Sequence, residues 1–80
     1  MRVQVLVRLK AGVLDVQGKA VERGIAHNGF ENVTDVRIGR LIELTVDDGD
    51  QASVQKQVEK LCSDLLANPV IEDYEIRPAE

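Results

Sequence analysis

Side chains that could do chemistry are few in this sequence. It has one histidine (His27), one cysteine (Cys62) and no tryptophan. A zinc site needs about four nitrogen or sulfur ligands, which these two residues cannot supply. The sequence contains no glycine-rich loop of the Walker or dinucleotide-binding type that would cradle a phosphate. The composition therefore predicts a chain with no catalytic residue, cofactor or metal of its own, in which His27 has a structural or solvent-facing role.

Two arginines are the most suggestive charged side chains. Arg37 and Arg40 flank Gly39, close enough together to bind one carboxylate or phosphate, and the alternative is that both are simply solvated. The net charge is +3 over residues 1–40 and −7 over residues 41–80, a polarity that favours docking to a second copy or to another protein. We expect the two arginines to meet carboxylates across an interface and to contribute little to folding.

A second block of residues completes the predicted docking site. Asn68 precedes Pro69 where a predicted helix ends, and recognition residues commonly lie at such element boundaries. Glu72 and Asp73 follow as complementary carboxylates. The full set of interface candidates is Arg37, Gly39, Arg40, Asn68, Glu72, Asp73 and Tyr74.

Length and composition exclude several classes of protein. Eighty residues, 44% apolar and 30% charged, make one small globular domain spanning 1–80. A single cysteine and a charged, alternating first segment predict a reducing, cytoplasmic setting without a signal peptide. No apolar run approaches the ~18 residues of a membrane span. The net charge of −4 argues against a nucleic-acid partner, as does the lack of strand aromatics other than Tyr74.

Hydrophobic periodicity predicts the elements. Residues 3–9 alternate as a strand, and Asp15 can cap a helix that Asn28-Gly29 closes, with Leu14, Gly18, Val21 and Ile25 as its apolar stripe. Residues 33–46 are either one long strand bent at Gly39 or a hairpin turning there. Asp47-Asp48-Gly49-Asp50 forms a turn that caps a second helix, whose stripe is Val54, Val58, Leu61, Cys62 and Leu65. The last strand covers 70–76, and the chain is expected to fray from Arg77 onward.

This order predicts an α+β fold with a ferredoxin-like β-α-β(β)-α-β plan, in which two helices pack on one face of an antiparallel sheet. Leu6 and Leu41 fall on the opposite face, as does Ile71 if Tyr74 turns inward. A strand of 14 residues would span ~46 Å and invite pairing with a second copy. Because burial and chain entropy nearly cancel in so small a domain, we expect a homodimer or tetramer.

Motifs spread over nearly the whole chain resemble the PurS family. They are VLD at 13–15, QGKAV at 17–21, DVRIGR at 35–40 and, most specific, LLANPVIEDY at 65–74. The family usually has proline where this chain has Val16, a change that should cost only some rigidity at the helix start. Fewer residues, AGVL at 11–14, resemble the ligand-binding turn of ACT domains.

The PurS resemblance implies a non-catalytic subunit of phosphoribosylformylglycinamidine synthase. That complex converts formylglycinamide ribonucleotide (FGAR), glutamine and ATP to the amidine FGAM, glutamate, ADP and phosphate. The implied partners are a large synthetase subunit, which uses ATP and Mg²⁺, and a glutaminase subunit, which releases ammonia. The small subunit would support assembly and ammonia transfer between them. The ACT resemblance implies an amino-acid-binding regulatory dimer, which stays open as the alternative.

Overall fold

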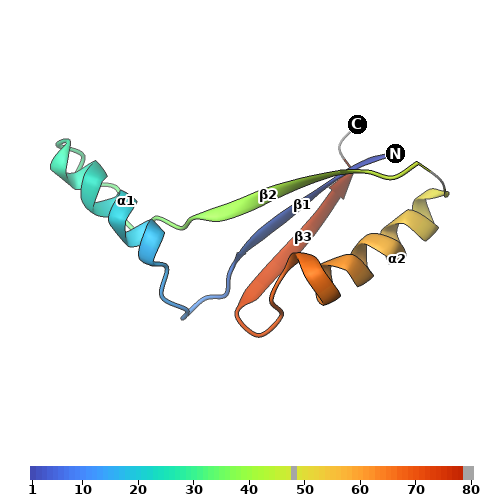
Figure 1. The fold of residues 1–80 in the computed structure, drawn as a ribbon. Coiled ribbons are helices and arrows are strands. Elements are labelled where there is room, and N and C mark those ends of the chain that lie inside the picture. Colours follow the sequence, from blue (N-terminus) through green and yellow to red (C-terminus); the bar gives the residue numbers. More distant parts are fainter. Residues whose placement is uncertain (48, 79–80) are drawn as a thin grey trace.

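The computed structural model describes residues 1–47 and 49–78, which form a three-stranded sheet and two helices (Figure 1). The elements are β1 (Arg2–Leu9), α1 (Val16–His27), β2 (Gly39–Thr45), α2 (Gln51–Leu61), η1 (Cys62–Leu66) and β3 (Glu72–Pro78). The predicted order β-α-β-α-β is confirmed, and η1 is a π-helical turn that continues α2. No helix in the described part of the chain is both long and apolar enough to cross a membrane.

The sheet has the order β2-β1-β3, and both pairings are antiparallel. Val5 lies opposite Ile42 on one side and Ile76 on the other. The alternating valines of β1 all lie on the face of the sheet that is buried in the core. The last strand runs two residues further than predicted: Pro78 pairs with Val3, so the expected fraying from Arg77 is wrong. The buried core consists of Val3, Val5, Val7, Val54, Val58, Cys62 and Ala67.

Helix α2 covers one face of this sheet. Asp50 caps it by accepting a 2.8 Å hydrogen bond from the Ser53 amide, as the predicted turn requires, although Asp48 of that turn lies outside the described residues. The predicted stripe is wrong at its end, since Leu65 is 75% exposed. The wider π turn of η1 adds a residue to the helical repeat, so Leu66 packs against the core in its place.

Helix α1 does not pack on the sheet. Its predicted ends are correct: Asp15 accepts a hydrogen bond from the Gly18 amide at 2.8 Å, and Gly29 has the positive φ of a helix stop. Its predicted stripe, however, is largely uncovered, with Leu14 69% and Val21 42% exposed. Figure 1 shows α1 beyond the end of the sheet, so the expectation of two helices on one sheet face is wrong for this helix within the chain.

The stretch 33–46 is neither a single long strand nor a hairpin. Only residues from Gly39 onward pair with β1, and residues 33–38 run beside α1 instead. The amides there have other partners: Ile38 donates to the Asp15 carboxylate at 2.7 Å, and Val36 donates to Glu22 at 3.4 Å. Helix α1 and residues 33–38 together form a projection, called the arm below.

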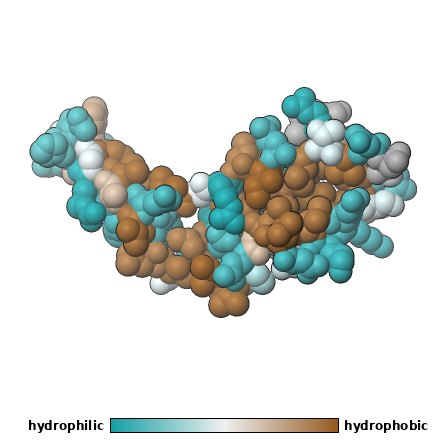
Figure 2. Space-filling view, in the orientation of Figure 1, coloured by the Kyte–Doolittle hydropathy of each residue, from teal (hydrophilic) through white to brown (hydrophobic). Residues whose placement is uncertain are grey.

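The arm makes the chain unusually extended. The radius of gyration is 15.9 Å, and the extents are 49 × 28 × 14 Å. A compact domain of this length has a radius of gyration of about 12 Å. Figure 2 shows apolar surface on the arm as well as over the α2 side of the sheet, with a concave outline between the two. Gly18 permits close backbone packing within the arm, because a Cβ there would overlap the carbonyl oxygen of Val36.

Candidate docking site

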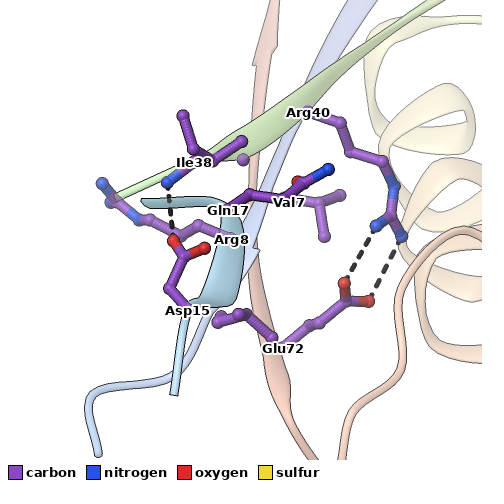
Figure 3. A pocket seen from close by; sticks show the side chains of 9 residues that line it. Val7, Arg8, Asp15, Gln17, Ile38, Arg40 and Glu72 are labelled. Atoms are coloured by element: carbon purple, nitrogen blue, oxygen red, sulfur yellow. Dashed lines mark hydrogen bonds and ion pairs between the residues drawn. The ribbon is translucent and has the colours of Figure 1, made fainter. Parts of the chain in front are cut away.

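Arg40 forms the centre of the predicted site, and its partner lies in the same chain. It extends from β2 across Val7 to Glu72 on β3, where two guanidinium nitrogens lie 2.9 and 3.2 Å from the carboxylate oxygens (Figure 3). It also donates to the Leu66 carbonyl at 2.7 Å. Arg40 is therefore not simply solvated, because its guanidinium has partners within the chain, and a contact with a carboxylate across an interface stays a prediction. We call Arg40 and Glu72 the clamp.

Asn68 joins the clamp through its backbone. Its amide donates to Glu72 Oε1 at 2.7 Å, and its side-chain oxygen accepts from the Val70 amide at 3.0 Å. Its carbonyl accepts from the Ile71 and Glu72 amides. The loop after η1 is thus folded back on itself and tied to β2. Arg40, followed by the Asn68 amide, lowers the pKa of Glu72 below its ordinary value of 4.5.

Arg37 has a different environment. Its guanidinium donates to the carbonyl oxygens of Leu9, Lys10 and Val13, at 3.2–3.3 Å. These carbonyls belong to the last residue of β1 and to the segment between β1 and α1. Arg37 therefore fastens the returning segment of the arm to the outgoing one and fixes how the arm leaves the sheet. The expectation that Arg37 and Arg40 bind one common carboxylate is not met within the chain.

Asp15 also joins the start of α1 to the returning segment of the arm, at the junction between the arm and the sheet. From the sequence, only its role as a helix cap was predicted. Its exposed fraction is only 5%, and it accepts from two backbone amides, those of Gly18 and Ile38. These two bonds, that from Ile38 first, hold its pKa below the ordinary 3.8. The capping role was predictable from the local sequence. The bond to Ile38 was not, because nothing in the sequence indicates that residues 36–38 return beside the helix start.

The other candidates lie around this junction on both faces of the sheet. Gly39 lies opposite Arg8, and a Cβ on it would be only 2.5 Å from the Val7 carbonyl oxygen, so glycine is required by close backbone approach. Tyr74 lies opposite Val7 on the α2 face and is 38% exposed. Asp73 lies opposite Arg8 on the other face.

A pocket of about 200 Å³ marks the angle between the arm and the sheet (Figure 3). Asp15, Ile38, Gly39, Arg40 and Glu72 are among its lining residues. The structure thus brings Gly39, Arg40 and Glu72 to one hollow, with Arg37 and Asn68 supporting it, and places Asp73 on the opposite face. Their role in docking stays a prediction.

Comparison with known proteins identifies the family. The sequence model described as "PurS: Phosphoribosylformylglycinamidine (FGAM) synthase" matches residues 2–80. The phosphoribosylformylglycinamidine synthase subunit PurS of Bacillus subtilis (strain 168) is 45% identical over 73 residues, which are 91% of this chain and 86% of that protein.

Solved structures agree with the sequence match. A structure of B. subtilis PurS has a TM-score of 0.86 and 43% identity, and the match covers 99% of this chain and 98% of that one. A chain in the structure of PurLQS from Thermotoga maritima has a TM-score of 0.87 and 32% identity, with coverages of 95% and 93%. These matches favour the PurS resemblance over the ACT one. The chain belongs to the PurS family, whose members are the small subunit of FGAM synthase.

Proposed function

We propose that this chain is the bridging subunit of an FGAM synthase, which joins FGAR and glutamine-derived nitrogen at the expense of ATP. The observation that carries this proposal is the family match over residues 2–80. The similarity to a chain of PurLQS supports the view that it works beside a synthetase and a glutaminase subunit. In this role it promotes assembly and secures ammonia transfer, in the cytoplasm, without performing either reaction.

The chemistry of the chain supports a non-catalytic role. Burial raises the pKa of the Cys62 thiol above its ordinary value, and the Glu59 carboxylate adds to this, so the thiolate nucleophile is disfavoured. Within residues 1–47 and 49–78, no group of three or more histidine, cysteine and acidic side chains is placed to hold a metal. We propose that the synthetase subunit uses ATP and Mg²⁺ and that this chain binds no cofactor.

The geometry supports bridging in two ways. The clamp and Arg37 hold the arm and the η1–β3 loop in fixed positions, so recognition groups are presented without an ordering cost on binding. The candidates also lie on opposite faces of the sheet, with Tyr74 on the α2 face and Asp73 on the other, in a chain whose smallest extent is 14 Å. A thin chain of this kind can contact a different subunit on each face.

The test is co-elution of the chain with the synthetase and glutaminase subunits from the same organism. In size-exclusion chromatography with glutamine and ADP-Mg²⁺, we expect one peak that contains all three. The docking candidates are then tested with Asp73→Lys, an open-face substitution outside the clamp, against the matched control Asp64→Lys on η1. We expect Asp73→Lys to weaken co-elution and the control to leave it intact. Separate elution of the unaltered chain would contradict the proposal, and equal behaviour of the two variants would remove Asp73 from the site.

A further inference from the structure

Strand β3 forms one edge of the sheet, and in the described part of the chain no strand lies along its outer side. The order β2-β1-β3 gives β3 a neighbour on one side only. The Lys10 amide donates to the Ile71 carbonyl at 2.9 Å. In an antiparallel pair, residues alternate between bonded and non-bonded positions, so the odd-numbered residues of β3 bond to β1. The amides of Tyr74 and Ile76 therefore point outward.

The two ends of this outer edge are closed. At one end, the outward amide of Glu72 already donates to the Asn68 carbonyl at 2.7 Å, as the alternation requires. At the other end, Pro78 has no amide hydrogen to donate. The outward amides of Tyr74 and Ile76 lie between these ends. Such an edge fits a short extended segment, because an unpaired strand edge is a template for a further strand.

The side chains on the α2 face of this edge are apolar and only partly covered. Tyr74 is 38% exposed, and Ile76 is half-buried. Ile76 lines a pocket of about 40 Å³ with other apolar side chains and with Gln51 and Gln55 of α2. Figure 2 shows apolar surface on this side of the molecule. A strand added at the edge would therefore bury apolar side chains of its own against α2 and β3.

The opposite face of the edge favours a positively charged neighbour. Glu75 is paired with Arg77 at 2.6 Å. Asp73 is exposed, and no cation of residues 1–47 and 49–78 forms an ion pair with it. A segment along the edge sets one of its side chains beside Asp73, where a basic residue gains a cross-strand pair of opposite charge. The net charge of −4 on the chain favours the same kind of segment.

We propose that the outer edge of β3 binds a short extended segment of one of the larger synthase subunits, which adds a strand to the three-stranded sheet. Carbonyl groups of that segment accept from the Tyr74 and Ile76 amides, its apolar side chains lie on the α2 face, and a basic side chain lies beside Asp73. The clamp holds the start of β3 through Glu72, so the edge is ordered before binding. This inference rests on the proposed bridging function and names one of its contact surfaces.

The first test is amide hydrogen exchange of the chain, alone and in the complex with the synthetase and glutaminase subunits. Exchange is quenched and then read residue by residue by NMR of the isotope-labelled chain. We expect the Tyr74 and Ile76 amides to exchange fast in the chain alone and at least about tenfold more slowly in the complex. The amides of Asp73, Glu75 and Arg77, which bond to β1 in both states, are the internal control and should change less.

Three outcomes would overturn the inference, and they separate it from the proposed function. A complex that forms while the Tyr74 and Ile76 amides still exchange fast would contradict the edge contact alone. Protection of both amides in the chain alone, at the same concentration, would assign the edge to a second copy. Failure of the three chains to assemble would contradict the bridging function, and the inference would fall with it.

The second test compares Tyr74→Pro with the matched control Tyr74→Ala. Both variants lose the aromatic ring, but only proline removes the outward amide, and neither change touches a bond to β1. The dissociation constant of the complex should be about tenfold higher for Tyr74→Pro than for Tyr74→Ala, because one hydrogen bond is lost and its carbonyl partner is left unsatisfied. Equal constants for two folded variants would overturn the proposal. The exchange measurement uses the unaltered chain, so it decides the question even if the proline variant does not fold.

Discussion

The contribution of the clamp to the free energy of unfolding can be predicted from its contacts. Replacing Arg40 by glutamate removes an ion pair worth about 1 kcal/mol at this partial exposure. It removes the bond to the Leu66 carbonyl, worth about 1 kcal/mol. It also places a second carboxylate near Glu72, and two like charges about 4 Å apart repel by about 1 kcal/mol even in a water-like dielectric. Arg40→Glu should therefore destabilise the chain by about 3 kcal/mol.

The charge swap isolates the ion pair from the other losses. Arg40→Glu combined with Glu72→Arg restores opposite charges but lacks the bonds to Leu66 and Asn68, worth about 1 kcal/mol each, so the swap should remain destabilised by about 2 kcal/mol. For 80 residues, 1 kcal/mol corresponds to about 6 °C in Tm. We expect Arg40→Glu to lower Tm by about 18 °C and the swap by about 12 °C, in circular-dichroism melts at equal protomer concentration. If Arg40→Glu melts with the unaltered chain, the clamp contributes nothing and the reasoning fails.

Two further predictions concern the arm. Gly18→Ala should lower the free energy of unfolding by about 1–2 kcal/mol in urea titrations, because its methyl group meets the Val36 carbonyl. The control Gly24→Ala, with open space around it, should be neutral or stabilising by up to ~1 kcal/mol. A larger loss of stability in Gly24→Ala than in Gly18→Ala would be inconsistent with this packing of the arm. Because folding lowers the pKa of Asp15 below 3.8, the unfolded chain takes up the proton first as pH falls, and the stability that this carboxylate contributes is present above about pH 4 and lost below it. Asp15→Asn should therefore be less stable than the unaltered chain at pH 7, and the difference in Tm should shrink between pH 5 and pH 3; a constant difference would show that the charge does not matter.

The sequence predicted the body of the fold well because its signals there are local. Alternation in β1 and the caps at Asp15 and Asp50 depend on near neighbours, and the structure retains them. The predicted apolar stripe of α2 is wrong at Leu65 because a π turn changes the helical repeat there, and no residue pattern in the sequence indicates a π turn. Helix α1 was placed on the sheet because an apolar stripe indicates that something covers it, without saying whether the cover comes from the same chain.

The site was predictable in its residues but not in its contacts. Arg40 and Glu72 are 32 positions apart, and their pairing requires β1 to lie between β2 and β3. Sequence reasoning assigned these two charges to partners in other chains, because nothing local brings them together. The same holds for Arg37, whose carbonyl partners are 24 to 28 residues away. Long-range topology, which single-sequence patterns do not encode, decides both outcomes.

The central claim is that this chain couples a glutaminase to a synthetase without being a catalyst. The most direct measurement is FGAM formation by the two larger subunits of the same organism, with glutamine or with ammonium as the nitrogen source, in the presence and absence of this chain. We expect glutamine-dependent synthesis to require the chain, whereas ammonium-dependent synthesis needs it far less and the chain alone forms no product. Full glutamine-dependent activity in its absence would contradict the account.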